Sequence, residues 1–158
     1  MLLEGSCHCR AVTFSVESAH PYPFNLCYCG TCRKTQGSGG FAINLAGDNA
    51  TLKVDGEAHV TVYQATLESG ERSPSRRHFC SRCGSALWAW DPRWPELVHP
   101  TASAVDTPLP VPPERTHLML DYRPDWVADV VADGDLCAGE YPEEAIAEWH
   151  ERLGLSAP

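Results

Sequence analysis

The sequence is short of positive charge. Its 158 residues include 12 lysines and arginines against 21 aspartates and glutamates, which gives a formal net charge of −9. Proteins bind nucleic acids and anionic membrane surfaces through an excess of basic side chains that neutralise phosphates. We therefore expect no nucleic-acid partner and no attachment to an anionic membrane.

Long apolar runs are also missing. Nowhere do about 18 apolar residues follow one another, which is the length that a membrane-spanning helix needs. The N-terminal run, Met1-Leu2-Leu3-Glu4-Gly5, lacks the basic and then apolar stretches of a secretory signal. We expect a cytoplasmic protein that has no membrane partner.

The chain is expected to form one mainly β domain over residues 1–158, because its length suits a single core. Short runs alternate apolar and polar side chains and are separated by turn residues, as in half-buried strands. The predicted strands are residues 11–16, 41–45, 51–54, 59–63, 86–90 and 117–122. Prolines recur over residues 91–113, which we expect to be a loop.

A single helix is predicted near the C-terminus, over residues 142–154. Pro142 suits the first turn of a helix and Gly154 suits its end. Ile146, Trp149 and Leu153 recur at intervals of three and four, which predicts an apolar stripe that packs on the sheet.

Eight cysteines carry most of the functional information. In a chain without an export signal, clustered cysteines are expected to be reduced thiols that bind metal. Seven of them lie in three clusters, and Cys137 stands alone as an expected half-buried apolar residue. The clusters are Cys7-His8-Cys9, Cys27-Tyr28-Cys29-Gly30-Thr31-Cys32 and Cys80-Ser81-Arg82-Cys83.

The spacing predicts two zinc ions per chain. Structural zinc takes four tetrahedral ligands, often as two pairs from two short loops. The outer pairs, Cys7, Cys9, Cys80 and Cys83, would form a closed structural site, named here the four-cysteine site. Cys27, Cys29 and Cys32 would form an open catalytic site, the three-cysteine site, with one coordination position free. An iron–sulfur cluster or a set of disulfides remains an alternative use of these thiols.

Charged and titratable neighbours of the cysteines are further candidates. Arg33, Lys34 and Arg82 could offset the charge of the thiolates, or could be ordinary solvated side chains. His8 and His78 could act as general acids or bases, although both lie beside ligands of the four-cysteine site.

The three motifs, in this order, resemble the glutathione-dependent formaldehyde-activating enzyme family, which shares its domain with centromere protein V. They are Gly5-Ser6-Cys7-His8-Cys9, Cys27-Tyr28-Cys29-Gly30-Thr31-Cys32-Arg33-Lys34 and Phe79-Cys80-Ser81-Arg82-Cys83-Gly84. The similarity covers residues from 3 to about 133, which we take as the core, and leaves residues 134–158 as a C-terminal extension. Tyr28 stands where many relatives have histidine.

The resemblance implies an Mss4-like fold of small antiparallel sheets around the zinc sites, with the same division of the cysteines. It also implies a carbon–sulfur lyase of the S-(hydroxymethyl)glutathione synthase type, which joins a glutathione-like thiol to formaldehyde or a related small aldehyde. In this hypothesis the thiol becomes the fourth zinc ligand and attacks the aldehyde as a thiolate.

Two alternatives remain from the residues alone. One is a zinc-dependent hydrolase acting on an imine or activated carbonyl, and the other is a non-catalytic zinc-binding module.

Overall fold

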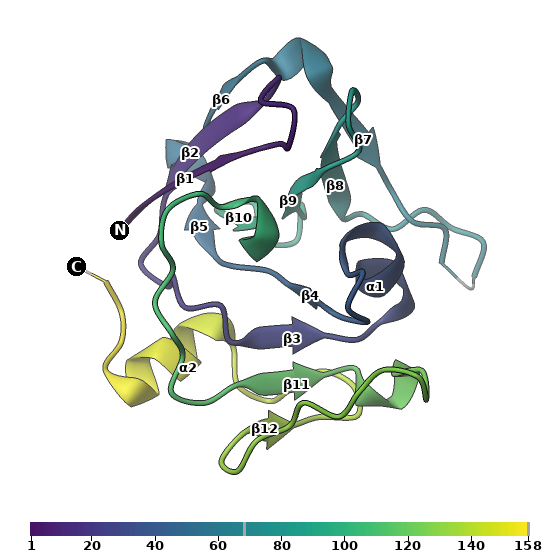
Figure 1. Ribbon diagram of the computed structural model, residues 1–158, viewed down its shortest axis with the longest axis vertical. Helices are drawn as coiled ribbons and strands as arrows, with labels where there is room; N and C mark the ends of the chain where they lie inside the picture. The colour runs from purple at the N-terminus through teal and green to yellow at the C-terminus, as the bar shows by residue number, and fades with distance from the viewer. Residues whose placement is uncertain (68, 158) are drawn as a thin grey trace.

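The computed structural model describes residues 1–67 and 69–157; residue 158, the last of the predicted domain, lies outside these ranges. Three small β-sheets follow one another across the molecule, with helix α1 between the second and third sheets (Figure 1). The α-helices are α1 (Gly30–Gln36) and α2 (Ile146–Leu153). The 3₁₀ helices are η1 (Asn49–Thr51), η2 (Glu57–His59), η3 (Ala102–Ala104) and η4 (Leu120–Tyr122).

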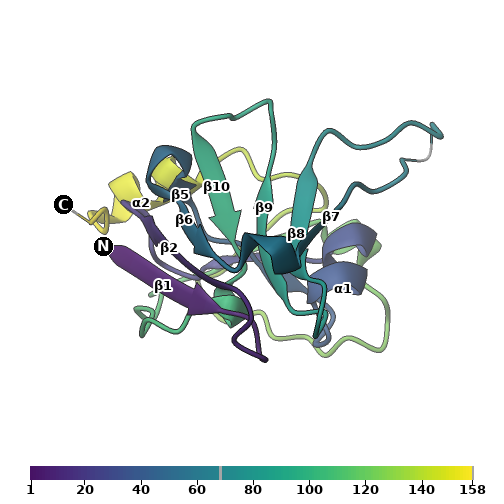
Figure 2. The ribbon, with the colours of Figure 1, turned by 90° about the horizontal axis from the view of Figure 1, so that it is seen from above.

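The first two sheets are antiparallel. The first has the order β1 (Leu2–Ser6), β2 (Thr13–Glu17) and β6 (Lys53–Asp55). The second has the order β5 (Gly47–Asp48), β10 (Leu97–Pro100), β9 (Ala86–Trp90), β8 (Arg76–Cys80) and β7 (Val60–Tyr63). Figure 2 views the second sheet from above, with β1 and β2 beside it.

The third sheet is mixed. Its order is β12 (Leu136–Cys137), β11 (Thr116–Leu118), β3 (Asn25–Cys27) and β4 (Ala42–Ile43). The β3–β4 pair is antiparallel, whereas β11 runs parallel to both β3 and β12. The prediction of a mainly β fold with small antiparallel sheets and a short C-terminal helix is confirmed, with these parallel pairs as an unpredicted addition.

The main core lies between the first two sheets. Leu3, Val16 and Leu87 are fully buried there, and Phe14 meets Trp88 edge to face with ring centroids 5.5 Å apart. Cys7 and Cys80, two of the predicted metal ligands, belong to the same buried cluster. Packing of the core therefore brings together turns that lie more than 70 residues apart in the sequence.

Several predicted boundaries are wrong. The predicted strand at 117–122 ends at Leu118 and gives way to η4, and β10 lies inside the predicted loop at 91–113. Helix α2 begins at Ile146 rather than Pro142, because the Glu148 carboxylate accepts a hydrogen bond from the Ala145 N–H at 2.7 Å and so caps the helix there. Its end at Gly154, with φ +65°, is as predicted.

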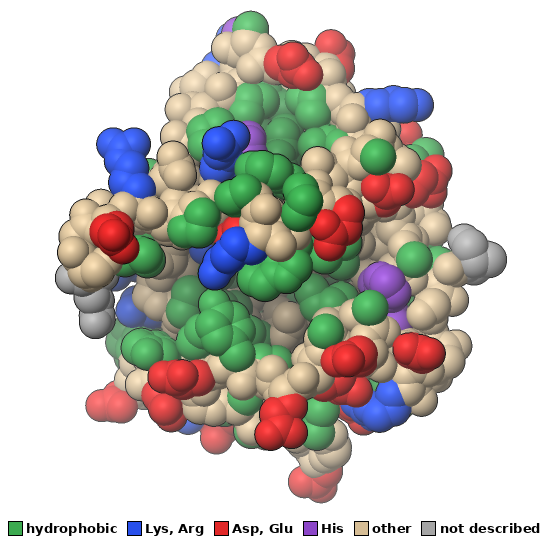
Figure 3. All heavy atoms as spheres, turned by 180° about the vertical axis from the view of Figure 1, so that it is seen from behind, with side chains coloured by type: hydrophobic (Ala, Val, Ile, Leu, Met, Phe, Trp, Pro, Cys, Tyr) green, Lys and Arg blue, Asp and Glu red, His purple; other side chains and the backbone are tan. Residues whose placement is uncertain are grey.

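The apolar stripe of α2 packs onto the body of the protein. Trp149 is fully buried and stacks on Phe24, with ring centroids 3.9 Å apart. None of the helices in the described residues is long and apolar enough to cross a membrane. Acidic side chains spread over the face of the molecule drawn in Figure 3, in keeping with the net charge.

Candidate functional site

Cys7, Cys9, Cys80 and Cys83 come together as the spacing predicted. Their Sγ atoms all lie within 4.8 Å of one another. The Sγ atoms of Cys7 and Cys9 are 3.6 Å apart, and those of Cys9 and Cys80 are 3.8 Å apart. Cys7 and Cys80 are buried, whereas Cys9 and Cys83 are exposed, so one edge of this four-cysteine site faces solvent.

Two similar turns present these cysteines. After β1, the Arg10 N–H donates to the Cys7 carbonyl at 2.9 Å, and the Val12 N–H donates to the Cys7 sulfur at 3.3 Å. After β8, the Gly84 N–H donates to the Cys80 carbonyl at 2.8 Å. Gly84 has φ +75°, a conformation that glycine adopts without strain, and therefore closes its turn tightly.

Cys27, Cys29 and Cys32 form the second group. Cys27 ends β3, Cys29 is the N-cap of α1, and Cys32 lies in the first turn of that helix. The Cys32 N–H donates to the Cys29 sulfur at 3.4 Å. The three Sγ atoms lie within 4.8 Å of one another, and no fourth Cys, His, Asp or Glu of the described residues joins them.

Both groups fit a soft divalent metal ion such as zinc. Sulfurs held tetrahedrally at about 2.3 Å from zinc are about 3.8 Å apart. The distances of 3.6 and 3.8 Å in the four-cysteine site match this separation. All-thiolate donor sets favour zinc or iron–sulfur clusters over hard cations. The two cysteine groups could therefore each hold a metal ion.

The thiols of the three-cysteine site differ in pKa. Hydrogen bonds from Cys27 and then Cys32 lower the pKa of the Cys29 thiol to about 2. Hydrogen bonds of Cys27 with Cys29 and then with Cys32, together with burial, raise the pKa of the Cys27 thiol. In the four-cysteine site, hydrogen bonds with Ser85 lower the pKa of Cys83 to about 5. Each group thus contains a cysteine whose thiol loses its proton more readily than an ordinary cysteine thiol does.

Arg77, on β8, is a cation beside the three-cysteine site that was not predicted from the sequence. Its Nη2 donates to the Cys32 sulfur at 3.7 Å. Its Nε is buried and has no hydrogen-bond partner among the described residues. The signal in the sequence is its position three residues before Cys80, in strand β8, which was not among the predicted strands.

The predicted cations lie elsewhere. Arg33 and Lys34 line a cavity beside α1, and Arg82 is exposed in the turn before Cys83. Of the two predicted histidines, His8 lines the same cavity. His78 stacks on Trp88, with ring centroids 5.0 Å apart, and burial lowers its pKa. Cys137 is exposed on β12 and belongs to neither cysteine group, so its predicted half-burial is wrong.

Tyr28 lies between two members of the three-cysteine site but turns away from solvent. It is fully buried, and its Oη lies 2.9 Å from His117 Nδ1. His117 Nε2 in turn lies 3.0 Å from a carboxylate oxygen of Asp135, in the C-terminal extension. Tyr28 therefore anchors the cysteine loop to the interior and presents no exposed surface to the three-cysteine site.

A family model described as "Glutathione-dependent formaldehyde-activating enzyme" matches residues 2–120. A protein of Halomonas elongata, provisionally named as a glutathione-dependent formaldehyde-activating enzyme, is 64% identical over 155 residues, which are 98% of each chain. A crystal structure of a Rhodobacter sphaeroides protein has a TM-score of 0.54 and 26% identity, and covers 68% of this chain and 91% of its own. Strand β12 and helix α2 lie beyond the residues that the family model matches.

Proposed function

This chain belongs to the glutathione-dependent formaldehyde-activating enzyme family, and we propose that its three-cysteine site joins a thiol to a small aldehyde. Glutathione and formaldehyde are the proposed substrates, because the family description contains both. The bond formed is carbon–sulfur, which makes the protein a carbon–sulfur lyase of the S-(hydroxymethyl)glutathione synthase type. The proposal depends chiefly on one observation: no fourth Cys, His, Asp or Glu of the described residues completes this site.

Cys27, Cys29 and Cys32 would hold the catalytic zinc, and Cys7, Cys9, Cys80 and Cys83 the structural one. A zinc ion held by these three thiolates would act as a Lewis acid and lower the pKa of the substrate thiol. It would also keep one coordination position free for that thiol. The chain itself contributes the fixed arrangement of the three sulfurs, set by the end of β3 and the first turn of α1.

In the proposed reaction the substrate thiol loses its proton and its sulfur attacks the aldehyde carbon. A carbon–sulfur bond forms, the π electrons of the carbonyl move to oxygen, and that oxygen takes up the proton that the thiol released. Arg77 would hold the negative oxygen, because its guanidinium already reaches the Cys32 sulfur and carries a buried Nε without a partner among the described residues.

The rest of the chain supports this site in the proposal. Residues 1–158 would act as one domain, in which the extension at 134–158 anchors the cysteine loop through Asp135 and His117. Free cysteines are stable in a reducing compartment, which supports a cytoplasmic location. The acidic charge supports small-molecule partners over nucleic acid.

Exchange spectroscopy tests the proposal by measuring how fast formaldehyde and glutathione equilibrate with their adduct. We expect the zinc-loaded protein to accelerate this exchange, Cys29→Ser to abolish the acceleration, and Cys137→Ser, a control on exposed β12, to retain it. No acceleration at high protein concentration would reject this pair of substrates.

A further inference from the structure

Met119 packs against the three-cysteine site from the end of the third sheet. Cys27 and Cys32 belong to a small buried cluster with Leu118, and the Met119 side chain packs on this cluster. Cys27 and Cys32 are buried, whereas Met119 and Cys29 are only half-buried. The Met119 side chain therefore lies at the boundary between the sulfurs and solvent, where a small molecule would arrive.

The backbone fixes Met119 beside the cysteine loop. Leu118 pairs in parallel with Cys27, and its carbonyl accepts a hydrogen bond from the Tyr28 N–H at 3.0 Å. Met119 follows directly, so its Cα lies about 3.8 Å from that of Leu118. The Met119 N–H then donates to the Glu140 carbonyl at 2.8 Å. Strand β11 and the segment after β12 together hold the side chain at the site.

Met119 has an unusual backbone conformation. Its φ is +61° and its ψ is +36°, in the left-handed region that residues with a Cβ rarely adopt. Among the described residues, Arg10 is the one other non-glycine with a positive φ. A glycine would adopt this conformation without strain but would offer no side chain. Because strain of this kind is typical of functional sites, its presence at Met119 favours a role for the side chain itself.

The segment that holds Met119 belongs to the C-terminal extension. The carbonyls of residues 138–140 accept hydrogen bonds from the N–H groups of residues 119–121 at 2.8–3.1 Å. The family model ends at residue 120, before this segment begins. The conformation of Met119 is thus set by a part of the chain that the family model does not match.

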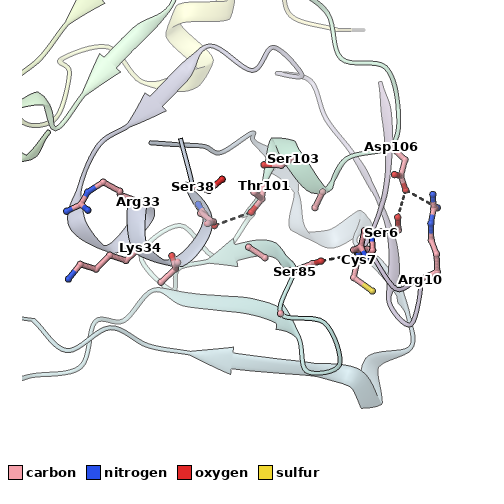
Figure 4. A pocket seen from close by; sticks show the side chains of 17 residues that line it. Ser6, Cys7, Arg10, Arg33, Lys34, Ser38, Ser85, Thr101, Ser103 and Asp106 are labelled. Carbon is pink, nitrogen blue, oxygen red and sulfur yellow. Dashed lines mark hydrogen bonds and ion pairs between the residues drawn. The ribbon is translucent and has the colours of Figure 1, made fainter. Parts of the chain in front are cut away.

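Arg77 is the polar neighbour of the same site. From β8 in the second sheet, its Nη2 donates to the Cys32 sulfur at 3.7 Å. Arg33 and Lys34, which follow Cys32 in α1, line the cavity drawn in Figure 4. The described lining of that cavity contains neither Met119 nor a sulfur of the three-cysteine site. The open position therefore has a cationic neighbour in Arg77 and an apolar neighbour in Met119, and the two come from different sheets.

We propose that Met119 determines which aldehydes the three-cysteine site accepts, by occupying the space that a substituent on the aldehyde carbon would need. The inference rests on the proposed function and specifies its second substrate. Formaldehyde carries two hydrogens on its carbonyl carbon, whereas every other aldehyde carries a larger group there. With the carbonyl oxygen held by Arg77, such a group would collide with the Met119 side chain. The site thus favours formaldehyde over branched aldehydes such as isobutyraldehyde.

Exchange spectroscopy with glutathione and either formaldehyde or isobutyraldehyde tests the inference. The ratio of the two accelerations is expected to favour formaldehyde in the wild type and to fall about tenfold in Met119→Ala, because the shorter side chain leaves room for the substituent. Met119→Leu, which has a similar volume, should keep the wild-type ratio. Val111→Ala, at an apolar side chain that is 82% exposed, is the matched control and should also keep it.

A second variant, Met119→Gly, separates the side chain from the backbone strain. Glycine keeps the left-handed conformation without strain, so this variant is expected to unfold at a higher temperature than Met119→Ala. Both variants lack the long side chain, so both should accept isobutyraldehyde. If only Met119→Ala changed the aldehyde ratio, the change would come from a disturbed backbone and the inference would be overturned.

Methyl NMR locates Met119 without any reaction. The chain contains two methionines, and Met1 packs on the main core instead. With isotope-labelled methionine methyl groups, cobalt(II) in the three-cysteine site is expected to shift the Met119 signal strongly. This shift should be absent from Cys29→Ser, in which only the four-cysteine site binds the metal. A Met119 signal that cobalt shifts equally in both proteins would overturn the inference.

Failure of this inference differs from failure of the proposed function. If formaldehyde exchange is accelerated while neither Met119→Ala nor Met119→Gly changes the aldehyde ratio, the inference is overturned and the reaction stands. If the wild-type protein accelerates exchange with neither aldehyde, the proposed function is overturned. The cobalt-induced shift then decides alone whether Met119 borders the open position.

Discussion

Arg77 is the residue whose position bears most directly on chemistry at the three-cysteine site. Its guanidinium carries a fixed positive charge within 3.7 Å of the Cys32 sulfur, and strand β8 holds it there. A cation at this distance can offset thiolate charge and can stabilise an oxyanion. The two roles have different consequences when the residue is changed.

We expect Arg77→Gln to lower kcat of the exchange reaction by about 100-fold, as loss of an oxyanion donor does in other enzymes. Arg77→Lys should recover part of that loss, because it keeps the charge without the planar fork. Zinc content should stay at the wild-type value in both variants. If zinc content fell while kcat per bound zinc stayed unchanged, Arg77 would act only by offsetting the charge of the cysteine thiolates and would not stabilise the oxyanion.

Asp135 links stability to pH. Burial raises the pKa of its carboxyl, but hydrogen bonds from the Ala132 N–H, from His117 and from the Arg115 N–H outweigh burial and leave the pKa lowered. A lowered pKa means that the ionised carboxylate stabilises the folded state above the unfolded pKa of about 3.9. That stability is lost as pH falls through the folded value.

Asp135→Asn is therefore expected to reduce the free energy of unfolding at pH 7 by about 1–3 kcal/mol, because buried partners lose a charged acceptor. Urea denaturation at several pH values should show the gap to wild type narrowing below about pH 4. Asp125→Asn, at an exposed position, is the control. If the difference in unfolding free energy between wild type and Asp135→Asn stayed constant down to pH 3, the stabilising role of the ionised Asp135 carboxylate would be contradicted.

At the level of elements, helix α2 has the clearest energetic role. Trp149 is fully buried and stacks on Phe24, which directly precedes β3 and its Cys27. The helix thereby packs against the residue that leads into β3, the strand that positions the three-cysteine site. Its stripe of apolar side chains was readable from the sequence because a helical repeat is local.

Trp149→Ala is expected to lower the free energy of unfolding by about 3–5 kcal/mol, the usual cost of removing a large buried aromatic side chain. Trp126→Ala, at a residue that is 66% exposed, should cost far less and serves as the matched control. Urea denaturation measures both. Equal losses for the two variants would show that α2 does not pack as described.

Prediction from the sequence succeeded where the determining contacts are close together in the chain. The Gly154 helix end and the short spacings within each cysteine cluster belong to this class, although the four-cysteine site itself joins two pairs more than 70 residues apart. The strand partners of β3 could not be predicted in this way, because β11 lies about 90 residues away in the sequence and pairs with β3 in parallel. The start of α2 was misplaced because the Glu148 cap outweighed Pro142 as a start signal.

Over the whole molecule, strand β8 connects the two cysteine sites. Arg77 reaches the sulfur of Cys32, and Cys80, three residues later, ends the strand in the four-cysteine site. A strand rises about 3.4 Å per residue, which places these two positions about 10 Å apart. The four-cysteine site also joins β1 to β8 across more than 70 residues, so a metal ion bound there would stabilise the fold directly.

The most direct test of this account is whether a thiol reaches the metal of one site and not the other. With cobalt(II) in place of zinc, visible absorption reports the ligands of each ion. We predict that glutathione changes the cobalt spectrum of the wild-type protein and leaves that of Cys29→Ser, in which only the four-cysteine site binds, unchanged. A wild-type spectrum that glutathione does not alter, or an equal change in Cys29→Ser, would contradict the account.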